Sequence, residues 1–535
     1  MDKENSKELK QILWDGADIL RSKMDANDYK DYLLGFVFYK FLSDKLLMEA
    51  YDLWEGGEPA SMEDAQKVYE EAMASGEADF QDQLKKAGRY LIKPALTYTK
   101  LVQNAETNKF QREDLQTAFN EIQQSDPLFD GLFKEVDLYS PRLGTGDTKQ
   151  SALIADLLKK VNEADLLHYS GDVLGDAYEY MIGQFASETG KKAGEFYTPR
   201  AVSEILARIA IAGKEDVEGL TVYDPAMGSA SLLLSLRKFS HEPALIQYYG
   251  QELVASTYNL ARMNMCLHGV DPSCQHLNNA DTLDKDWPTE EETNFHCVVM
   301  NPPYSQKWSA AKGFLSDARF SDFGVLPPKS KADYAFLLHG YYHLKHEGTM
   351  AIVLPHGVLF RGAAEGKIRQ KLLEMGAIYA VIGLPSNLFY NTTIPTTIVV
   401  LKKQRPDPLG RDVLFIDASK EFIRGKKQNQ LSEDNIQAIL SMYHERKDVD
   451  KHAHLASFEE IEKNDFNLNI PRYVDTFEEE PDIDIAALAE EMGETDQEIQ
   501  KAETELLKGL MELTAADEDS QKGLSQLLAL FQKEK

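Results

Sequence analysis

The tetrapeptide Asn301-Pro302-Pro303-Tyr304 carries residues whose types and spacing could do chemistry. It follows the apolar, β-rich run 296–300, which predicts a buried strand that the prolines end, because neither has an N–H for a ladder. Asn301 offers a side-chain carbonyl and Pro302 a backbone carbonyl, with the ring of Tyr304 beside them. Two acceptors and an aromatic face suit a planar ring that bears an exocyclic amino group. The tetrapeptide alone is equally consistent with a Pro-Pro turn after a core strand.

A strand, a tight turn and a helix are predicted over residues 220–234. The strand ends at Asp224, and the turn contains the small residues Gly228, Ser229, Ala230 and Ser231. Glycine permits an unusual turn, and small side chains let a ligand approach the backbone closely. The stretch is not G-x-G-x-x-G and no P-loop lysine follows it, so neither a dinucleotide-binding fold nor an NTPase is favoured.

Acidic residues lie at the ends of the next two predicted strands. The strand over 246–251 leads to Glu252, 24 residues after Gly228, which is placed to accept hydrogen bonds from ribose hydroxyls. Asp281 lies in a third strand-end loop, where it could accept from an adenine amino group. Open α/β sheets bind ligands at the carboxyl ends of their strands, so these acids and the Asn301 tip predict one site.

A further segment, Gly194-Glu195-Phe196-Tyr197-Thr198-Pro199-Arg200, precedes a predicted helix. Thr198 is predicted to be its N-cap, with Pro199 at the first helical position. The N-terminus of this helix would favour an anionic group such as a carboxylate. Taken alone, the segment is better explained as an ordinary capped helix.

The composition of the 535 residues, 43% hydrophobic and 27% charged, is that of a soluble globular protein. No apolar run is long enough for a membrane span, and the N-terminal residues have no signal-peptide pattern. The three cysteines lack a CxxC pair and predict reduced core thiols in a cytosolic protein, so no zinc or other metal site is expected. The net charge of −30 is awkward for an enzyme that binds DNA alone. Either a partner chain supplies basic surface, or the substrate is a small molecule.

The chain is predicted to have three parts. Residues 1–165 are mainly helical, and the aromatic-rich stretch 29–42 is expected in their core. Residues 166–474 alternate strands with helices, the pattern of an α/β domain. Residues 475–535 carry 18 acidic and 5 basic side chains, a net −13, and lead into amphipathic helices. This last part predicts a docking arm for a protein partner, although a helix packed on its own domain would have the same pattern.

From about Asp28 to Tyr473, the chain resembles the modification (M) subunit of type I restriction-modification systems, an N6-adenine DNA methyltransferase. Four motifs in family order carry the resemblance: Gly194 to Pro199 (motif X), Asp224 to Ala230 (motif I), Asn301 to Tyr304 (motif IV) and Asn467 to Tyr473 (the end of the catalytic region). The sequence departs from the family at Ala230-Ser231, where many relatives carry glycine, which puts the local turn in question.

The resemblance implies a Rossmann-like methyltransferase domain that takes its methyl group from S-adenosylmethionine. By position, Glu252 would accept from the ribose and Asp281 from the adenine of the cofactor. The methionine end would be bordered by Glu195, Phe196, Tyr197, Thr198, Pro199 and Arg200, and the turn beside the cofactor would be formed by Asp224, Gly228, Ser229, Ala230 and Ser231. Transfer would be direct, from the sulfonium to N6 of an adenine turned out of the duplex, with Asn301, Pro302, Pro303 and Tyr304 as catalytic residues.

The family also implies partners. A separate specificity (S) subunit would recognise the DNA sequence, usually with two M chains, and a restriction (R) subunit can join. The helical domain would help to close the complex around DNA, and the C-terminal arm would pack on S. The alternatives are a stand-alone or other phage-defence adenine methyltransferase, a silent S-adenosylmethionine-binding scaffold, and an N4-cytosine methyltransferase, against which Asn301 favours adenine.

Overall fold

The computed structural model describes residues 2–21, 23–164, 171–188, 198–290, 292–389, 392–405, 410–425, 428–476, 485–515 and 517–532. The chain divides into two compact units, Met1–Thr476 and Phe477–Lys535. Among the helices in the described ranges, none combines the length and the apolar character that a membrane span requires.

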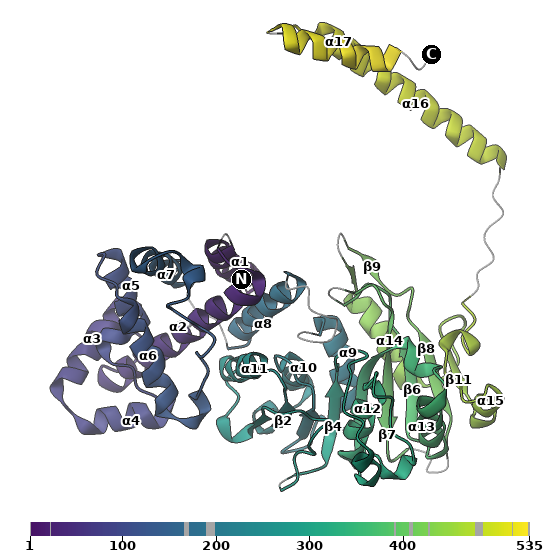
Figure 1. The fold of residues 1–535 in the computed structure, drawn as a ribbon, viewed down its shortest axis with the longest axis horizontal. Helices are drawn as coiled ribbons and strands as arrows, with labels where there is room; N and C mark the ends of the chain where they lie inside the picture. Colours follow the sequence, from purple (N-terminus) through teal and green to yellow (C-terminus); the bar gives the residue numbers. More distant parts are fainter. Residues whose placement is uncertain are drawn as a thin grey trace. The chain divides into compact units, whose positions relative to one another are not determined.

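Helices make up the N-terminal part of the chain, as its sequence predicts (Figure 1). Helix α2 is apolar on most sides, and Tyr29, Phe36, Phe38 and Tyr39 are all buried. The aromatic-rich stretch is therefore core and not an exposed surface for stacking bases. The longer helices in this part are α1 (Asp2–Arg21), α2 (Ala26–Trp54), α3 (Met62–Ser75), α4 (Ala78–Gly88), α5 (Tyr98–Glu106), α6 (Arg112–Ser125) and α7 (Asp147–Asn162).

A mixed sheet follows, with strand order β11-β8-β6-β7-β5-β4-β1-β2-β3. Strand β7 is antiparallel to β5 and β6, and β11 is antiparallel to β8, whereas the other neighbours are parallel. The strand order reverses between β4 and β1, which is where open α/β sheets form their ligand crevice. The strands are β1 (Thr221–Asp224), β2 (Gln247–Gln251), β3 (Gln275–Asn278), β4 (Phe295–Met300), β5 (Leu344–Pro355), β6 (Ile378–Gly383), β7 (Thr396–Lys402), β8 (Val413–Asp417) and β11 (Ala453–Ala456).

Helices cover both faces of this sheet. Successive strand residues alternate between two cores: Val299 packs with α9 (Arg200–Ile211), α11 (Ala255–Leu267) and α14 (Glu433–Glu445), whereas Val298 packs with α12 (Asp333–Tyr342) and α13 (Ala363–Glu374). The period of two follows from the pleat of a strand. This is the Rossmann-like fold class that the sequence predicts. Two short helices, α10 (Ser231–Ser235) and α15 (Phe458–Lys463), complete the layers.

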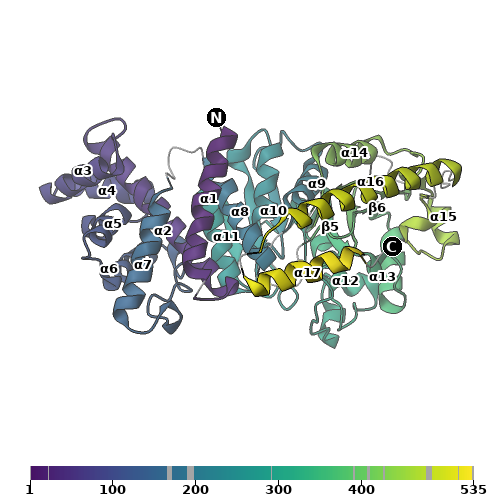
Figure 2. The ribbon, with the colours of Figure 1, turned by 90° about the horizontal axis from the view of Figure 1, so that it is seen from above.

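The N-terminal helices share a hydrophobic core with α8 (Gly171–Glu188) and α11. Both ribbon views place α1 beside α8 (Figures 1 and 2). Arg262 of α11 is buried and donates hydrogen bonds to the carbonyls of Pro127, Leu128 and Asp130 at 2.6–3.0 Å. Breaking these hydrogen bonds would leave a buried guanidinium without acceptors, which costs free energy. Arg262 therefore stabilises the contact between the N-terminal helices and α11.

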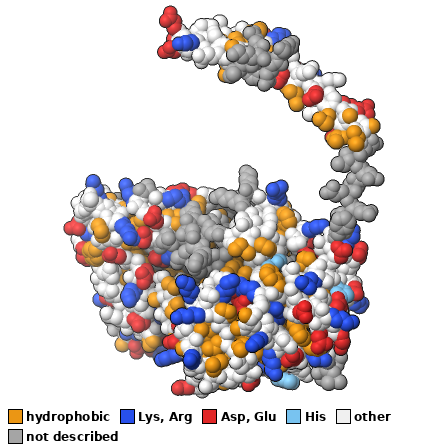
Figure 3. Space-filling model, turned by 45° about the vertical axis from the view of Figure 1, so that its right-hand side comes forward, with side chains coloured by type: hydrophobic (Ala, Val, Ile, Leu, Met, Phe, Trp, Pro, Cys, Tyr) orange, Lys and Arg blue, Asp and Glu red, His pale blue; other side chains and the backbone are white. Residues whose placement is uncertain are grey.

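The second unit contains α16 (Ile485–Glu512) and α17 (Glu518–Gln532). No residue of α16 is buried. Apolar side chains are instead exposed on the surface of these helices (Figure 3): Ile485, Leu488, Met492, Ile499, Leu506, Met511 and Leu527.

Candidate active site

The Asn301 side chain is fixed on both sides by hydrogen bonds. Asn301 directly follows β4 and is buried, at 4% exposure. Its Nδ2 donates to Thr198 Oγ1 at 3.0 Å, and its Oδ1 accepts from the Tyr304 hydroxyl at 2.8 Å. An amide oxygen has two lone pairs, so Oδ1 keeps one for a further donor. In the described part of the chain, no group donates a hydrogen bond to the carbonyl of Pro302.

Thr198 does not cap helix α9, contrary to the sequence-based prediction. The helix begins at Arg200 and its N-cap is Pro199, and among the described residues no side chain caps it. The carbonyl of Pro199 accepts from the N–H groups of Val202 and Ser203, at 2.9 and 3.0 Å. The Thr198 hydroxyl meets Asn301 instead, because the fold brings the two segments together and a hydroxyl serves either partner.

Tyr304 is half-buried, and its ring meets that of Phe389 edge-on, with centroids 6.1 Å apart. Burial, with a smaller contribution from the Asp333 carboxylate, raises the pKa of Tyr304 well above its ordinary value of 10. The phenol therefore keeps its proton at physiological pH and acts as a hydrogen-bond donor to Asn301.

The turn after β1 has two residues with positive φ, Gly228 at 56° and Ala230 at 63°. The carbonyl of Ser229 accepts from Asn264 Nδ2 at 2.9 Å, and the hydroxyls of Ser229 and Ser231 lie 2.9 Å apart. Ala230 therefore adopts the left-handed conformation that glycine adopts most easily, and an L-residue is strained there. The departure from the family at this position therefore leaves the turn intact.

Asp224 lies beneath this turn and is 1% exposed. Its Oδ1 accepts from the N–H of Ala226 at 2.9 Å. Burial, together with the nearby carboxylate of Glu252, raises the pKa of Asp224 to about 8. The side chain orients the turn from below and does not line the cavity above it.

A cavity of about 270 Å³ opens at the carboxyl ends of β1, β2 and β3, next to the Asn301 tip. Glu252 lines it and accepts hydrogen bonds from the N–H groups of Gly228 and Val254, at 3.1 and 2.8 Å. Asp281 lines it too, is exposed, and accepts from the N–H of Leu283 at 2.9 Å. The volume is just below the range of roughly 300–1,000 Å³ usual for ligand sites, so the cavity suits part of a cofactor.

Several of the predicted site residues line one of two hollows or lie on the tip after β4. Glu252, Asp281 and Pro303 line the cavity. Thr198, Arg200 and Ser231 line a second hollow of about 60 Å³ with Glu179 of α8. Asn301 and Tyr304 lie on the tip between them, while Glu195, Phe196 and Tyr197 fall outside the described residues. The larger cavity is also lined by seven residues that were not predicted as site residues: Leu253, Val254, Thr257, Ala280, Thr282, Gln306 and Phe336.

Exposure marks some of these missed residues. Leu253 and Val254 are apolar, follow Glu252 directly and are exposed. In the sequence, two apolar residues directly after an acid at the end of a strand could have predicted that they line a ligand site. Phe336 comes from α12, far along the chain, and had no comparable local signal.

Charged groups surround the smaller hollow. Asp176 pairs with Arg200 at 3.0 Å and with Lys238 at 3.1 Å. Burial alone would raise the pKa of Asp176, but Lys238 and Arg200 lower it below its ordinary value. Burial raises the pKa of the neighbouring Glu179 to about 7. Asp176, Glu179 and His268 are close enough to hold a metal ion, but two cations already neutralise Asp176.

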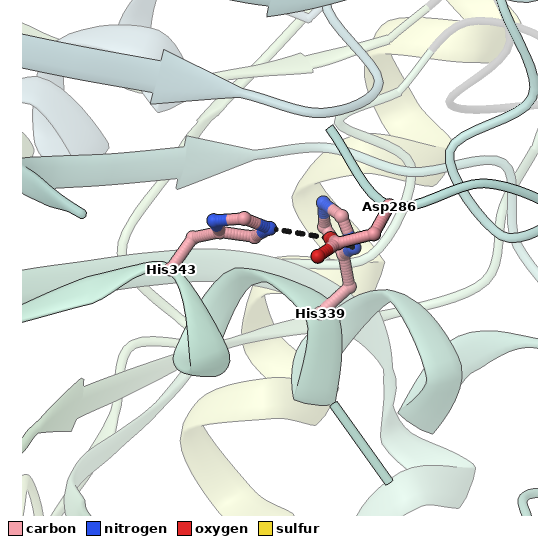
Figure 4. Close-up of side chains that lie close together, drawn as sticks. All are labelled: Asp286, His339 and His343. Atoms are coloured by element: carbon pink, nitrogen blue, oxygen red, sulfur yellow. Dashed lines mark hydrogen bonds and ion pairs between the residues drawn. The ribbon is translucent and has the colours of Figure 1, made fainter. Parts of the chain in front are cut away.

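A second cluster of this kind consists of Asp286, His339 and His343, whose side chains lie close together (Figure 4). His343 contacts Asp286 through Nε2 at 2.8 Å, and His339 Nε2 lies 2.8 Å from the hydroxyl of Tyr223. Arg319 donates to His339 Nδ1 and to the carbonyl of Thr282, a cavity residue. Burial, then His343 and Arg319, hold the pKa of His339 well below its ordinary value. With Arg319 inside it, the cluster braces the cavity wall and is not a cation site.

Comparison with known proteins adds to this geometry. Residues 9–161 match the family described as "HsdM N-terminal domain", and residues 169–482 match the family described as "N-6 DNA Methylase". The MpnII type I restriction enzyme methylase subunit of Mycoplasma pneumoniae is 39% identical over 90% of this chain and 91% of its own length. The MjaVIII methylase subunit of Methanocaldococcus jannaschii is 32% identical, over 96% and 85%.

A solved structure is similar as well. The crystal structure of a type I restriction-modification system methyltransferase subunit from Streptococcus thermophilus superposes with a TM-score of 0.86 at 57% sequence identity. The match covers 88% of this chain and all of that one. A modification subunit from Vibrio vulnificus, at 19% identity and a TM-score of 0.57, shares the fold.

Proposed function

This chain belongs to the N-6 DNA methylase family and is a type I restriction-modification methylase subunit, and we propose that it methylates N6 of an adenine turned out of DNA. One observation carries the proposal at the level of residues: the two acceptors, Asn301 Oδ1 and the Pro302 carbonyl, stand beside a cavity at the switch point of the sheet. A planar exocyclic amino group needs such a pair of acceptors.

The cavity fits part of S-adenosylmethionine, the methyl donor that this family implies. Glu252 and Asp281 present carboxylates on its wall, which suit the hydroxyls of a ribose and the amino group of an adenine. The apolar side chains of Leu253, Val254 and Phe336 suit the faces of a purine ring. When bound, the cofactor would supply a methyl group on a sulfonium. The same proposal places Thr198, Pro199 and Arg200 at the methionine end of the cofactor. It also places Gly228, Ser229, Ala230 and Ser231 in the turn beside the cofactor.

The residues of the tip would orient the target. Asn301 Oδ1 and the Pro302 carbonyl would accept from the amino group of the adenine and direct its nitrogen lone pair at the methyl group. Asn301 cannot remove a proton. Its contribution would be to hold the adenine amino group in line with the methyl group of the cofactor. Turning the adenine out costs a few kcal/mol. Stacking on Tyr304 would return about 1–3 kcal/mol of this.

The charge of the chain supports a division of labour among subunits. DNA affinity comes largely from contacts of Lys and Arg with phosphates, and a net charge of −30 opposes it. We therefore propose that a specificity subunit supplies sequence recognition, that a second copy of this chain joins it, and that a restriction subunit can be added. The exposed apolar side chains of α16 and α17 support a docking role for residues 475–535.

The test is methyl transfer from labelled S-adenosylmethionine to DNA that lacks the modification, by the purified chain alone and with its specificity subunit. Transfer that yields N6-methyladenine only with the partner is expected. Sequence-specific transfer by the chain alone would favour a stand-alone enzyme. An inactive chain that still binds the cofactor would favour an assembly scaffold.

Two variants test the residue roles in the same assay. Asn301→Ala is expected to abolish transfer while the complex still assembles, and retained turnover would remove Asn301 from the mechanism. Tyr304→Ala is expected to weaken transfer without weakening cofactor binding, because its ring would contact the base. Loss of cofactor affinity in Tyr304→Ala would contradict this role.

A further inference from the structure

A small hairpin stands at the same edge of the sheet as the catalytic tip. Its strands are β9 (Ile423–Arg424) and β10 (Asn429–Gln430), paired antiparallel. It follows β8, which is parallel to β6, and both run in the same direction as β4 because β7 between β6 and β5 is antiparallel to each. The carboxyl ends of β8 and β4 therefore share an edge. Figure 1 shows β9 projecting beyond the sheet there.

The hairpin is tied to the tip through the loop after β6. The backbone N–H of Asn429 donates to the carbonyl of Asn387 at 2.9 Å, and Asn429 Nδ2 donates to the carbonyl of Ser386 at 2.9 Å. In the same loop, Phe389 carries the ring that meets Tyr304 edge-on. This loop contacts the hairpin through Asn429 and Tyr304 through Phe389, so a target held at Tyr304 would bring its flanking duplex toward the hairpin.

The outward side chains of the hairpin combine apolar surface with positive charge. Phe422 is 36% exposed, Ile423 is 57% exposed, and Arg424 beside them is exposed as well. The one acidic residue, Glu421, is engaged by Asn435 Nδ2 at 3.0 Å. By sequence, residues 418–430 carry four basic side chains against this single acid, a net +3 in a chain of net −30. Two of the four, Lys426 and Lys427, lie outside the described residues. Exposed apolar side chains next to a basic side chain at the catalytic edge indicate a partner such as DNA. Its phosphates would bind the cation, and its stacked bases offer apolar surface.

We propose that Phe422 and Ile423 enter the base stack of the DNA at the position that the target adenine leaves, with Arg424 on a neighbouring phosphate. This inference rests on the proposed function, since it assumes that the adenine leaves the stack. Apolar side chains inserted there would replace part of the stacking energy that is lost when the adenine leaves. They would therefore lower the free energy needed to turn the adenine out of the duplex. The positive charge of the segment favours DNA over a protein partner as the occupant.

The experiment compares two duplexes in the assembled complex with the specificity subunit. Both contain the recognised site, identified from the positions of N6-methyladenine in genomic DNA. In one the target adenine is paired with thymine, and in the other it lies opposite an abasic site, where turning it out costs less. The variant is the double substitution Phe422→Ala and Ile423→Ala. The matched control is Leu245→Ala, because Leu245 is 45% exposed but lies just before β2, at the opposite edge of the sheet.

The double variant is expected to lose about tenfold or more in methyl transfer on the paired duplex, and little on the abasic one. Leu245→Ala should match the wild type on both. Equal losses on the two duplexes, with weakened assembly, would identify the hairpin as a protein-docking surface and overturn the proposal. Unchanged transfer on the paired duplex would overturn it as well.

A second readout does not depend on methylation. With 2-aminopurine at the target position, wild-type complex should increase the fluorescence on binding, and the double variant should reduce that increase. If the wild type turns out the 2-aminopurine but transfers no methyl group to the duplex that contains adenine, the proposed function fails while the hairpin is still tested. If the variant gives the full fluorescence increase, the proposed role of Phe422 and Ile423 is wrong.

Discussion

Replacing Thr198 by valine would remove the hydroxyl that holds the Asn301 amide while nearly preserving the shape of the side chain. The two groups are 3.0 Å apart, and both residues are buried, with exposures of 8% and 4%. A buried donor that loses its acceptor costs about 1–3 kcal/mol. If the Asn301 amide rotates to find another acceptor, the fraction of molecules with Oδ1 in the orientation needed for transfer falls by roughly 5- to 150-fold.

Single-turnover methyl transfer at saturating cofactor and DNA measures this fraction directly. Thr198→Val should lower the rate within that range and leave cofactor affinity close to wild type, because the hydroxyl is engaged with Asn301. Thr198→Ser keeps the hydroxyl and should retain most of the rate. A wild-type rate in Thr198→Val, or an equal loss in Thr198→Ser, would refute the reasoning. A selective loss of cofactor affinity would show that the Thr198 hydroxyl itself contributes to cofactor binding and not to the orientation of Asn301.

Three further predictions concern stability, measured by urea unfolding. The raised pKa of Asp224, about 8 against an ordinary 3.8, means that the folded state keeps a proton that the unfolded state releases. This group should lower wild-type stability by ~5 kcal/mol at most as pH rises from about 4 to about 8, and Asp224→Asn should make the slope shallower by that amount, leaving the part that comes from Glu179. Ala230→Gly should be nearly neutral, because relief of left-handed strain offsets the lost methyl, whereas Ala207→Gly inside α9 should cost about 1 kcal/mol or more. Arg262→Met should destabilise by about 3 kcal/mol or more and speed proteolysis between the N-terminal helices and the sheet; unchanged stability would show that the carbonyls it binds find other donors.

Elements with strong local signals follow the sequence closely. The strand before Asn301 was predicted over 296–300 and spans Phe295–Met300, because an apolar β-branched run and two prolines fix its nature and its end locally. The strand predicted over 246–251 is β2, Gln247–Gln251. The strand predicted to end at Asp224 is β1, Thr221–Asp224. In each case the signal lies within a few residues of the element that it specifies.

Contacts between distant segments were harder to read. Thr198 satisfies the local rule for an N-cap, yet its hydroxyl bonds Asn301, 103 residues away. Phe336 reaches the cavity from a helix whose place depends on the strand order. The anchoring of the β9–β10 hairpin to the loop beside Tyr304 likewise follows from β8 lying next to β6.

The sequence by itself determined the α/β class, the strand-end positions of Asp224, Glu252 and Asn301, and the motif order that identifies the family, because these depend on residue type and local spacing. The tertiary structure decided which of those residues meet. The order of the strands reverses between β4 and β1, and this reversal opens the cavity and sets Asn301 beside it. Strand order is the outcome of packing both faces of the sheet at once, and no local stretch of sequence contains it.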